Sequence, residues 1–283
     1  MAKYVFLLAL LVVGAFASPM SKDDDFEDDM SIFFDNAEVD IEGRIIGGNN
    51  APNGAYPWMV AMVNSNSRSL MCGGSLVNSR RVLTAAHCII PVLSGGQLIP
   101  SLRVVVGTNR WNSGGQSHRC QGFRNHPHYN PNTLKNDIGV LMTSTAIFTS
   151  NNIRPIALSW DFIGGGVPCR VSGWGRTRVG GSLATNLQEL RKNTVTGQHC
   201  VNEVARVARQ LNMRTIPVDP NVEICTFLAV NRGTCHGDSG SALVRNSNNQ
   251  QIGVVSWGLP CARGAPDVYA RVSSARNWLV TVL

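Results

Sequence analysis

The heptapeptide Cys235-His236-Gly237-Asp238-Ser239-Gly240-Ser241 constrains this chain more than any other stretch of its sequence. A serine hydroxyl is a weak nucleophile at neutral pH, so the motif gains meaning only if a base and an orienting carboxylate occur elsewhere. His87 lies in Thr84-Ala85-Ala86-His87-Cys88, and Asp137 precedes the apolar run Ile138 to Leu141. Together the three residues predict an acyl-transfer site that folding must assemble from distant segments.

Four further motifs occur in a fixed order along the chain: Ile45-Ile46-Gly47-Gly48, Cys72-Gly73-Gly74-Ser75-Leu76, Ser172-Gly173-Trp174-Gly175 and Val254-Val255-Ser256-Trp257-Gly258. With the order His87, Asp137, Ser239, which differs from that of subtilisin and the α/β-hydrolases, they resemble the secreted chymotrypsin-fold, trypsin-like serine proteases. The resemblance covers Ile45 to Leu283. Several short motifs at family-like spacing are specific, whereas any one alone would be weak.

The sequence also predicts secondary structure. Apolar or β-branched runs bounded by Gly, Asn or Pro indicate strands at 58–63, 103–106, 138–142, 188–191 and 251–255. Helical spacing of apolar residues occurs over Val201–Leu211, and a second short helix is predicted at Ser274–Val282. The resemblance implies an all-β fold of two six-stranded antiparallel barrels, with the active site in the cleft between them and a short C-terminal helix.

The first 44 residues differ in composition from the rest. Residues 1–17 have an early Lys3, an apolar run and the small-residue site Ala15-Phe16-Ala17, which predicts a secretory signal peptide. Residues 18–44 hold ten acidic residues against Lys22 and Arg44, and we interpret them as an acidic activation propeptide. Two readings of this segment stay open, since it either screens the cationic enzyme or only keeps the precursor soluble. The protease domain would span 45–283.

The region 45–283 is strongly basic, with 22 Lys and Arg residues against eight Asp and Glu. Twenty of these cations are Arg, which stays charged where Lys begins to lose its proton. This bias would suit an alkaline fluid. Cationic granule proteases share it, so the working pH stays open. We predict no nucleic-acid partner because no recognition motif accompanies the charge. We also predict no membrane anchor, because no later apolar run approaches the roughly 20 residues of a membrane span.

Eight cysteines behind a signal peptide indicate a disulfide framework. The resemblance implies the pairs Cys72 with Cys88, Cys200 with Cys225 and Cys235 with Cys261. Cys120 and Cys169 remain, and the family's usual partner position for Cys169 holds Arg245. They either pair with each other or stay as two free thiols.

The resemblance assigns roles to the catalytic residues. Ser239 would attack the peptide carbonyl, His87 would take its proton and pass it to the leaving amine, and Asp137 would orient the imidazole. The backbone N–H groups of Gly237 and Ser239 would bind the developing oxyanion. No cofactor is expected. No metal is expected either, because the segment 107–119, where the family's calcium loop lies, has no Asp or Glu.

Arg44-Ile45 looks like the activation bond of a zymogen. By resemblance, a trypsin-like protease would cleave it, and the freed α-amine of Ile45 would enter the second barrel and pair with Asp238. A buried carboxylate without a partner is unfavourable, so we expect the uncleaved chain to be inactive.

Substrate selection is where this sequence departs from the best-known family members. Gly233 stands where trypsins carry the aspartate that binds Lys or Arg, and Asp267 stands at a pocket-wall position that is usually glycine. Collagen-cleaving (brachyurin-type) digestive members share this arrangement and accept basic, aromatic and large aliphatic residues, which predicts mixed specificity. Alternatively, Asp267 turns away to bind Thr234 or the backbone, leaving a chymotrypsin- or elastase-like pocket. Gly258 would leave the pocket mouth open, and Ser256, Trp257 and Gly258 would pair with the substrate backbone.

We therefore predict a secreted, extracellular and monomeric serine endopeptidase with a digestive role. Its partners would be protein or peptide substrates, an activating protease and protein protease inhibitors. Two other interpretations stay open. One is a catalytically silent homologue that binds through its cationic face, and the other is a regulatory protease of a cascade. Silent members usually lose a triad residue or the activation arginine, and this chain keeps both.

Overall fold

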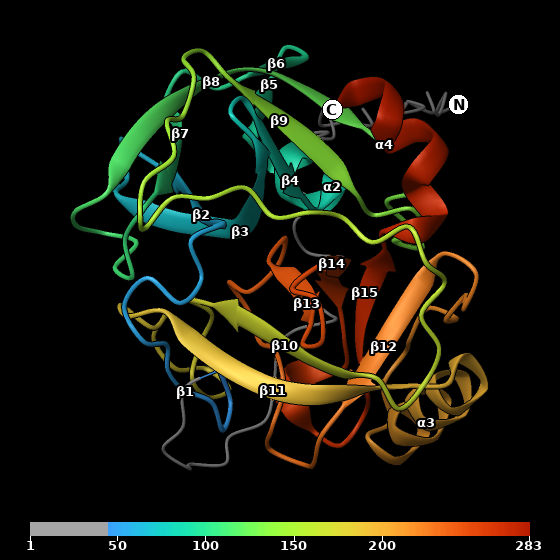
Figure 1. Cartoon of the computed structure of the whole chain (residues 1–283). Helices are drawn as coiled ribbons and strands as arrows, with labels where there is room; N and C mark the ends of the chain where they lie inside the picture. The colour runs from blue at the N-terminus through green and yellow to red at the C-terminus, as the bar shows by residue number, and fades with distance from the viewer. Residues whose placement is uncertain (1–44) are drawn as a thin grey trace, which may run out of the picture. The chain divides into compact units, whose positions relative to one another are not determined.

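The computed structural model describes residues 45–283, all within the unit Phe33–Leu283, so the predicted signal peptide and propeptide lie outside the described residues. Six strands of the first half close into an antiparallel barrel, seen in the upper part of Figure 1. In sheet order they are β2 (Met59–Asn64), β3 (Ser69–Asn78), β4 (Arg81–Thr84), β9 (Gly139–Thr143), β8 (Gln116–Asn125) and β7 (Leu102–Val106), which returns to β2. Their apolar side chains fill the interior, as Val60, Leu76, Leu83 and Val104 show.

A second barrel follows in the second half of the chain, in the lower part of Figure 1. In sheet order its strands are β11 (Gln188–Val195), β10 (Pro168–Gly173), β13 (Ala242–Arg245), β14 (Gln251–Trp257), β15 (Asp267–Arg271) and β12 (Glu223–Phe227). The pairing of β12 with β11 closes the ring, and β1 (Asn49–Asn50) adds to β11. The predicted fold of two six-stranded antiparallel barrels is confirmed.

Helices are short and lie between or after the strands. Among residues 45–283 they are α2 (Ala86–Ile89), α3 (Gly197–Gln210) and α4 (Arg276–Val282), with 3-10 turns at η1 (Ile90–Val92), η2 (Pro260–Ala262) and η3 (Ser273–Ala275). The helix predicted from Val201 starts earlier because Thr196 caps it, accepting a hydrogen bond from the backbone N–H of His199 at 3.3 Å. The predicted C-terminal helix is present as η3 followed by α4.

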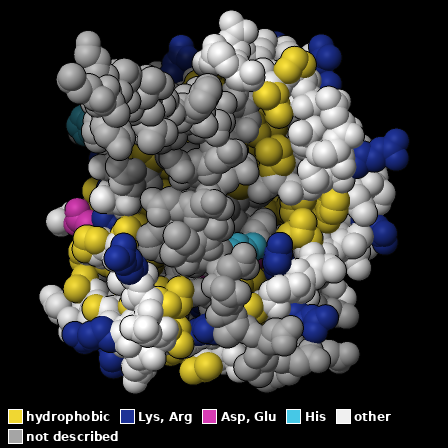
Figure 2. Space-filling view, turned by 180° about the vertical axis from the view of Figure 1, so that it is seen from behind, with side chains coloured by type: hydrophobic (Ala, Val, Ile, Leu, Met, Phe, Trp, Pro, Cys, Tyr) yellow, Lys and Arg dark blue, Asp and Glu magenta, His cyan; other side chains and the backbone are white. Residues whose placement is uncertain are grey.

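The segment after α2 forms a small hairpin of β5 (Leu93–Ser94) and β6 (Gln97–Leu98). Among residues 45–283, no helix is both long and apolar enough to cross a membrane. On the face shown in Figure 2, Lys and Arg side chains are spread over the described surface and acidic side chains are scarce, which agrees with the basic composition.

Three disulfides link the chain: Cys72 to Cys88, Cys200 to Cys225, and Cys235 to Cys261. Cys120 in β8 and Cys169 in β10 are free, so the open question about them resolves as two separate thiols. Burial raises the pKa of each thiol to about 12. Both therefore stay protonated at neutral pH and are unreactive there.

A buried ion pair joins the two barrels beside the site. Glu223 of β12 is almost fully buried, and its Oε1 lies 2.9 Å from Lys135 Nζ of the segment before β9. Trp257 Nε1 donates to the same carboxylate at 2.7 Å, and the backbone N–H of Asp219 donates at 2.7 Å. Burial raises the pKa of Glu223, while Lys135 and these donors act in the opposite direction. The pair connects the loop that carries Asp137 with the end of β14.

We expect Lys135→Met to destabilise the protein by about 2 to 4 kcal/mol, because it leaves a buried carboxylate without its cation. Urea unfolding at pH 7 measures this as a lower midpoint. Arg206→Met is the matched control, since Arg206 pairs with Glu203 on the exposed face of α3 and its loss should leave the midpoint almost unchanged. Equal shifts in the two variants would contradict a structural role for the Lys135 pair.

Candidate active site

His87 and Asp137 form a hydrogen-bonded pair. His87 lies in the single turn of α2, and its Nδ1 is 2.7 Å from Oδ2 of Asp137. The backbone N–H of His87 also donates to Oδ1 at 2.8 Å. Asp137 is fully buried and lies two residues before the start of β9. The two bonds fix both the position and the orientation of the imidazole.

The second barrel supplies another donor to the same carboxylate. Ser256 of β14 donates its hydroxyl to Asp137 Oδ2 at 2.5 Å. Burial alone would raise the pKa of Asp137, but the charge and hydrogen bonds of His87 and the bond from Ser256 lower it. For His87, burial would lower the pKa, and the carboxylate of Asp137 outweighs this and raises it. The aspartate therefore stays ionised and favours a protonated imidazole.

Ser239 lies on the turn before β13, against the segment that leads into α2. Its carbonyl accepts a hydrogen bond from Gly73 N–H at 2.7 Å, and the N–H of Gly240 donates to Val255 at 2.9 Å. Gly240 has a φ of +82° and packs directly on Thr84, where a Cβ atom would overlap its hydroxyl. This close approach requires glycine and holds the serine turn beside the histidine segment.

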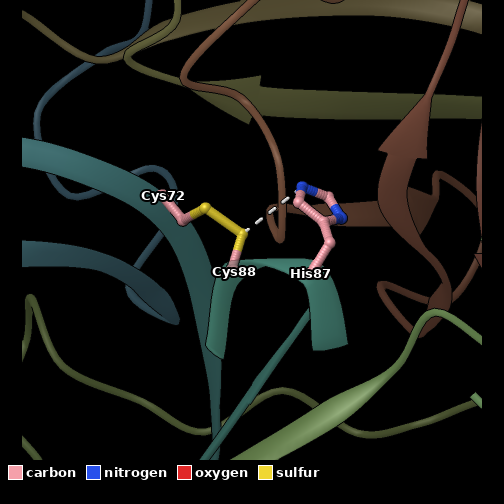
Figure 3. A group of neighbouring side chains, drawn as sticks. All are labelled: Cys72, His87 and Cys88. Atoms are coloured by element: carbon pink, nitrogen blue, oxygen red, sulfur yellow. Dashed lines mark hydrogen bonds between the residues drawn. A yellow bond between two sulfur atoms is a disulfide. The ribbon is translucent and has the colours of Figure 1, made fainter. Parts of the chain in front are cut away.

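Within the described residues, no hydrogen bond joins Ser239 Oγ to His87. The other ring nitrogen, Nε2, lies 3.7 Å from Cys88 Sγ, as Figure 3 shows beside the Cys72–Cys88 disulfide. Catalytic hydrogen bonds are often long without substrate and tighten when it binds. The three predicted residues are thus on adjoining segments at the junction of the barrels, with the His–Asp bond already made.

The turn before Ser239 leaves two backbone donors available. The N–H groups of Gly237 and Ser239 have no acceptor among residues 45–283. Gly237 has a φ of +95°, and a Cβ there would lie 2.6 Å from Leu183 Cδ2 and 3.1 Å from Gly175 Cα. Only glycine fits this backbone conformation without displacing its neighbours.

Asp238 points into the second barrel. It is fully buried and accepts hydrogen bonds from the N–H groups of Gly175 at 2.8 Å and Cys235 at 3.0 Å. Burial raises the pKa of Asp238 to about 7, although both bonds act in the opposite direction. Ile45 is also fully buried, in the apolar cluster of this barrel, whereas Arg44 lies outside the described residues.

The predicted specificity residues lie together. Asp267 is 5% exposed and accepts a hydrogen bond from Thr234 N–H at 3.0 Å. A Cβ on Gly233 would lie 3.0 Å from both of its carboxylate oxygens, and one on Gly258 would lie 3.7 Å from Oδ1. The carboxylate therefore faces both glycines while bound to the backbone.

One residue of this group, Lys192, was not predicted from the sequence, and its Nζ pairs with Asp267 Oδ2. A signal was available in the alternation of β11. Gln188, Leu190 and Thr194 are buried, and Lys192 shares their parity in the strand.

Two clusters among residues 45–283 have the residue types of a metal site: Cys72, His87 and Cys88, and Cys235, His236 and Cys261. In both, the cysteines are joined in disulfides. Zinc requires thiolate sulfur, so neither group is a zinc site of the usual kind.

A histidine held by a buried aspartate, beside a glycine-flanked serine at the junction of two antiparallel barrels, defines a serine hydrolase of the double-barrel class. Comparison of the sequence with known families agrees with this class and identifies the family. Residues 45–279 match the family described as Trypsin, and the chain belongs to this family. It is a serine endopeptidase, and enzymes of this kind act on protein substrates.

Insect trypsins are among the similar proteins. Trypsin alpha-4 of Lucilia cuprina is 37% identical over 242 residues, which cover 85% of this chain and 88% of that protein. Trypsin beta of Drosophila erecta is 35% identical with the same coverage. Trypsin alpha of Drosophila melanogaster is 35% identical over 243 residues, again with 85% and 88% coverage.

We expect Asp137→Asn to lower the pKa of His87 below the ordinary value of about 6.5, because burial of the ring remains while the carboxylate charge is lost. NMR titration of the imidazole resonances measures the change directly, without a substrate. Asp161→Asn removes an exposed aspartate and should leave the pKa of His87 unchanged. An unaltered pKa in the Asp137 variant would show that the carboxylate does not set the charge of the ring.

Proposed function

We propose that this chain is a secreted digestive endopeptidase made as a zymogen, with Ser239, His87 and Asp137 as its catalytic triad. The observation that carries the proposal is the 2.7 Å bond between His87 Nδ1 and the buried Asp137, beside the turn of Ser239. Similarity to fly trypsins supports a degradative role. An activating protease and protein inhibitors would be its partners, and it would act as a monomer outside the cell.

Each residue has a distinct part in the reaction. Ser239 Oγ attacks the peptide carbonyl while His87 Nε2 accepts its proton, and the same proton then passes to the leaving amine. Asp137 keeps the Nδ1 proton in place and stabilises the imidazolium. The N–H groups of Gly237 and Ser239 stabilise the oxyanion, and loss of one such donor typically costs about 3 to 4 kcal/mol. Water then attacks the acyl-enzyme by the reverse sequence of proton transfers.

The end of β14 would align the substrate. Ser256 is held by Asp137, and the Trp257 indole is held by Glu223, with Lys135 Nζ 5.4 Å from its ring centroid. A substrate backbone would add as an antiparallel strand along Ser256, Trp257 and Gly258. The substrate residue before the cut bond determines specificity, and the two interpretations of the pocket that accepts it are mixed or chymotrypsin-like specificity. The contacts of Asp267 support the second.

We expect Ser239→Ala and His87→Ala each to lower kcat/KM of the Arg44-cleaved protein by about 10⁴-fold to 10⁶-fold, because members of a triad act as a unit. Hydrolysis of a fluorogenic peptide measures the loss, and covalent labelling by a fluorophosphonate checks the serine itself. Ser247→Ala, at an exposed site, is the control and should keep full activity. Labelling that persists in Ser239→Ala would refute the assignment of the nucleophile.

Activation would follow from the charge of Asp238. In the uncleaved chain its buried carboxylate has backbone donors, and its pKa of about 7 means that it carries a proton through much of the range below neutrality. Cleavage after Arg44 would create the α-amine of Ile45, a cation able to enter the same barrel. The pair would then keep Asp238 ionised and hold the Ser239 turn in place.

Asp238→Asn is therefore expected to have opposite effects before and after cleavage. The raised pKa of Asp238 stabilises the uncleaved fold below the unfolded value of 3.8, and this contribution is lost as pH rises through about 7. The uncleaved variant should thus gain stability relative to the parent as pH rises from 4 to 8, by up to about 4 kcal/mol. After cleavage the same variant should be less stable and nearly inactive.

Thermal unfolding at several pH values, with and without trypsin treatment, measures both arms. Arg44→Gln is the control for cleavage, since it should resist trypsin at this bond and never show Ile45 as a new N-terminus. An effect of Asp238→Asn with the same sign in both forms would contradict the activation proposal.

A further inference from the structure

Lys192 is a charged residue at an inward position of the second barrel. Its side chain is fully buried, whereas its strand neighbour Arg191 is exposed. Lys192 Nζ pairs with Asp267 Oδ2 and lies 3.4 Å from the hydroxyl of Tyr269. A buried ammonium is tolerated only when it is paired and hydrogen-bonded, so Lys192 depends on Asp267 as its counter-ion.

The partner is the carboxylate beside the two glycines. Asp267 Oδ1 and Oδ2 each lie 3.0 Å from where a Cβ of Gly233 would stand, and Thr234 N–H occupies Oδ2 as well. Because Gly233 and Gly258 have no side chains, the ion pair takes up the space that a larger residue at 233 would fill. The negative charge at this place is thus already balanced from inside the barrel.

We infer that Lys192 is a specificity-determining residue, which neutralises the carboxylate of Asp267 and so makes the pocket select uncharged aromatic or large aliphatic side chains over Arg and Lys. This inference rests on the proposed function, since it concerns which peptide bonds that active site cuts.

The physical reason is competition for one carboxylate. A guanidinium or ammonium from the substrate would gain Asp267 only by drawing it away from Lys192, and a buried cation without a counter-ion is strongly unfavourable. Asp238 is the other buried carboxylate whose charge interacts with Lys192. In the cleaved enzyme it would be engaged by the α-amine of Ile45, so it offers no replacement. An uncharged side chain avoids this exchange.

The test uses Arg44-cleaved protein and Ala-Ala-Pro-Xaa p-nitroanilides with Phe, Leu or Arg before the cut bond. For the parent we expect kcat/KM for Arg to be at least about 100-fold below that for Phe. Lys192→Met keeps the length of the side chain without its charge and leaves Asp267 available. It should raise the ratio of Arg to Phe cleavage by about 100-fold.

Two variants complete the design. Adding Asp267→Asn to Lys192→Met removes the freed carboxylate and should return the ratio to the parent's low value. Arg191→Met removes a cation from the outer side of the same strand and should leave the ratio unchanged. The inference is overturned if the parent cleaves Arg as well as Phe, or if folded Lys192→Met shows no rise in the ratio.

Fluorophosphonate titration separates the two levels of the proposal. If the cleaved parent neither labels nor cleaves any anilide, the proposed function itself fails. If Lys192→Met does not fold, inhibition of the parent decides the matter: benzamidine, a cation, should bind no better than its neutral analogue benzamide. Benzamidine binding more than about tenfold tighter would show that Asp267 is free to bind a cation, and the inference would be wrong.

Discussion

The site depends on one buried carboxylate that receives hydrogen bonds from both barrels. Asp137 belongs to the first barrel, yet the hydroxyl of Ser256 reaches it from β14 of the second at 2.5 Å. The ring and the backbone N–H of His87 each make one further hydrogen bond to this carboxylate. A buried anion of this kind is stable only with several donors. The carboxylate that orients the imidazole therefore also depends on the second barrel being docked correctly, because Ser256 is one of those donors.

Charge inside this protein follows a consistent pattern. Residues 45–283 contain two lysines, Lys135 and Lys192, and each pairs with a buried carboxylate, Glu223 or Asp267. The far more numerous arginines are mostly at least partly exposed, as Arg191 and Arg206 are, although Arg271 is buried and donates to the backbone carbonyls of Ile163 and Glu223. A compact ammonium on a flexible stem can meet a single carboxylate in a confined site, whereas the planar guanidinium has five donors to satisfy. Both lysines of residues 45–283 are therefore in positions where a buried carboxylate requires a compact cation.

Several sequence-based interpretations depended on contacts that a linear pattern does not contain. The order His87, Asp137, Ser239 predicted the constellation, because order and local motif are properties of the chain itself. Asp267 was recognised as unusual for its position, but the sequence left its direction open. Its counter-ion, Lys192, lies 75 residues away on β11, so no local pattern in the sequence connects the two. Likewise, Cys120 and Cys169 stay unpaired because they belong to strands of different barrels.

The fold class and, through the family resemblance, the three disulfides could be predicted from the sequence and are confirmed, and the sequence also predicts Ser239, His87 and Asp137 as the catalytic residues. These follow from local motifs, strand periodicity and chain order, which are all written in the linear chain. The polar contacts made inside and between the barrels required the folded structure: Ser256 with Asp137, Glu223 with Lys135, and Asp267 with Lys192. Each of these contacts joins residues more than 70 positions apart, and the closure of the barrels brings them together.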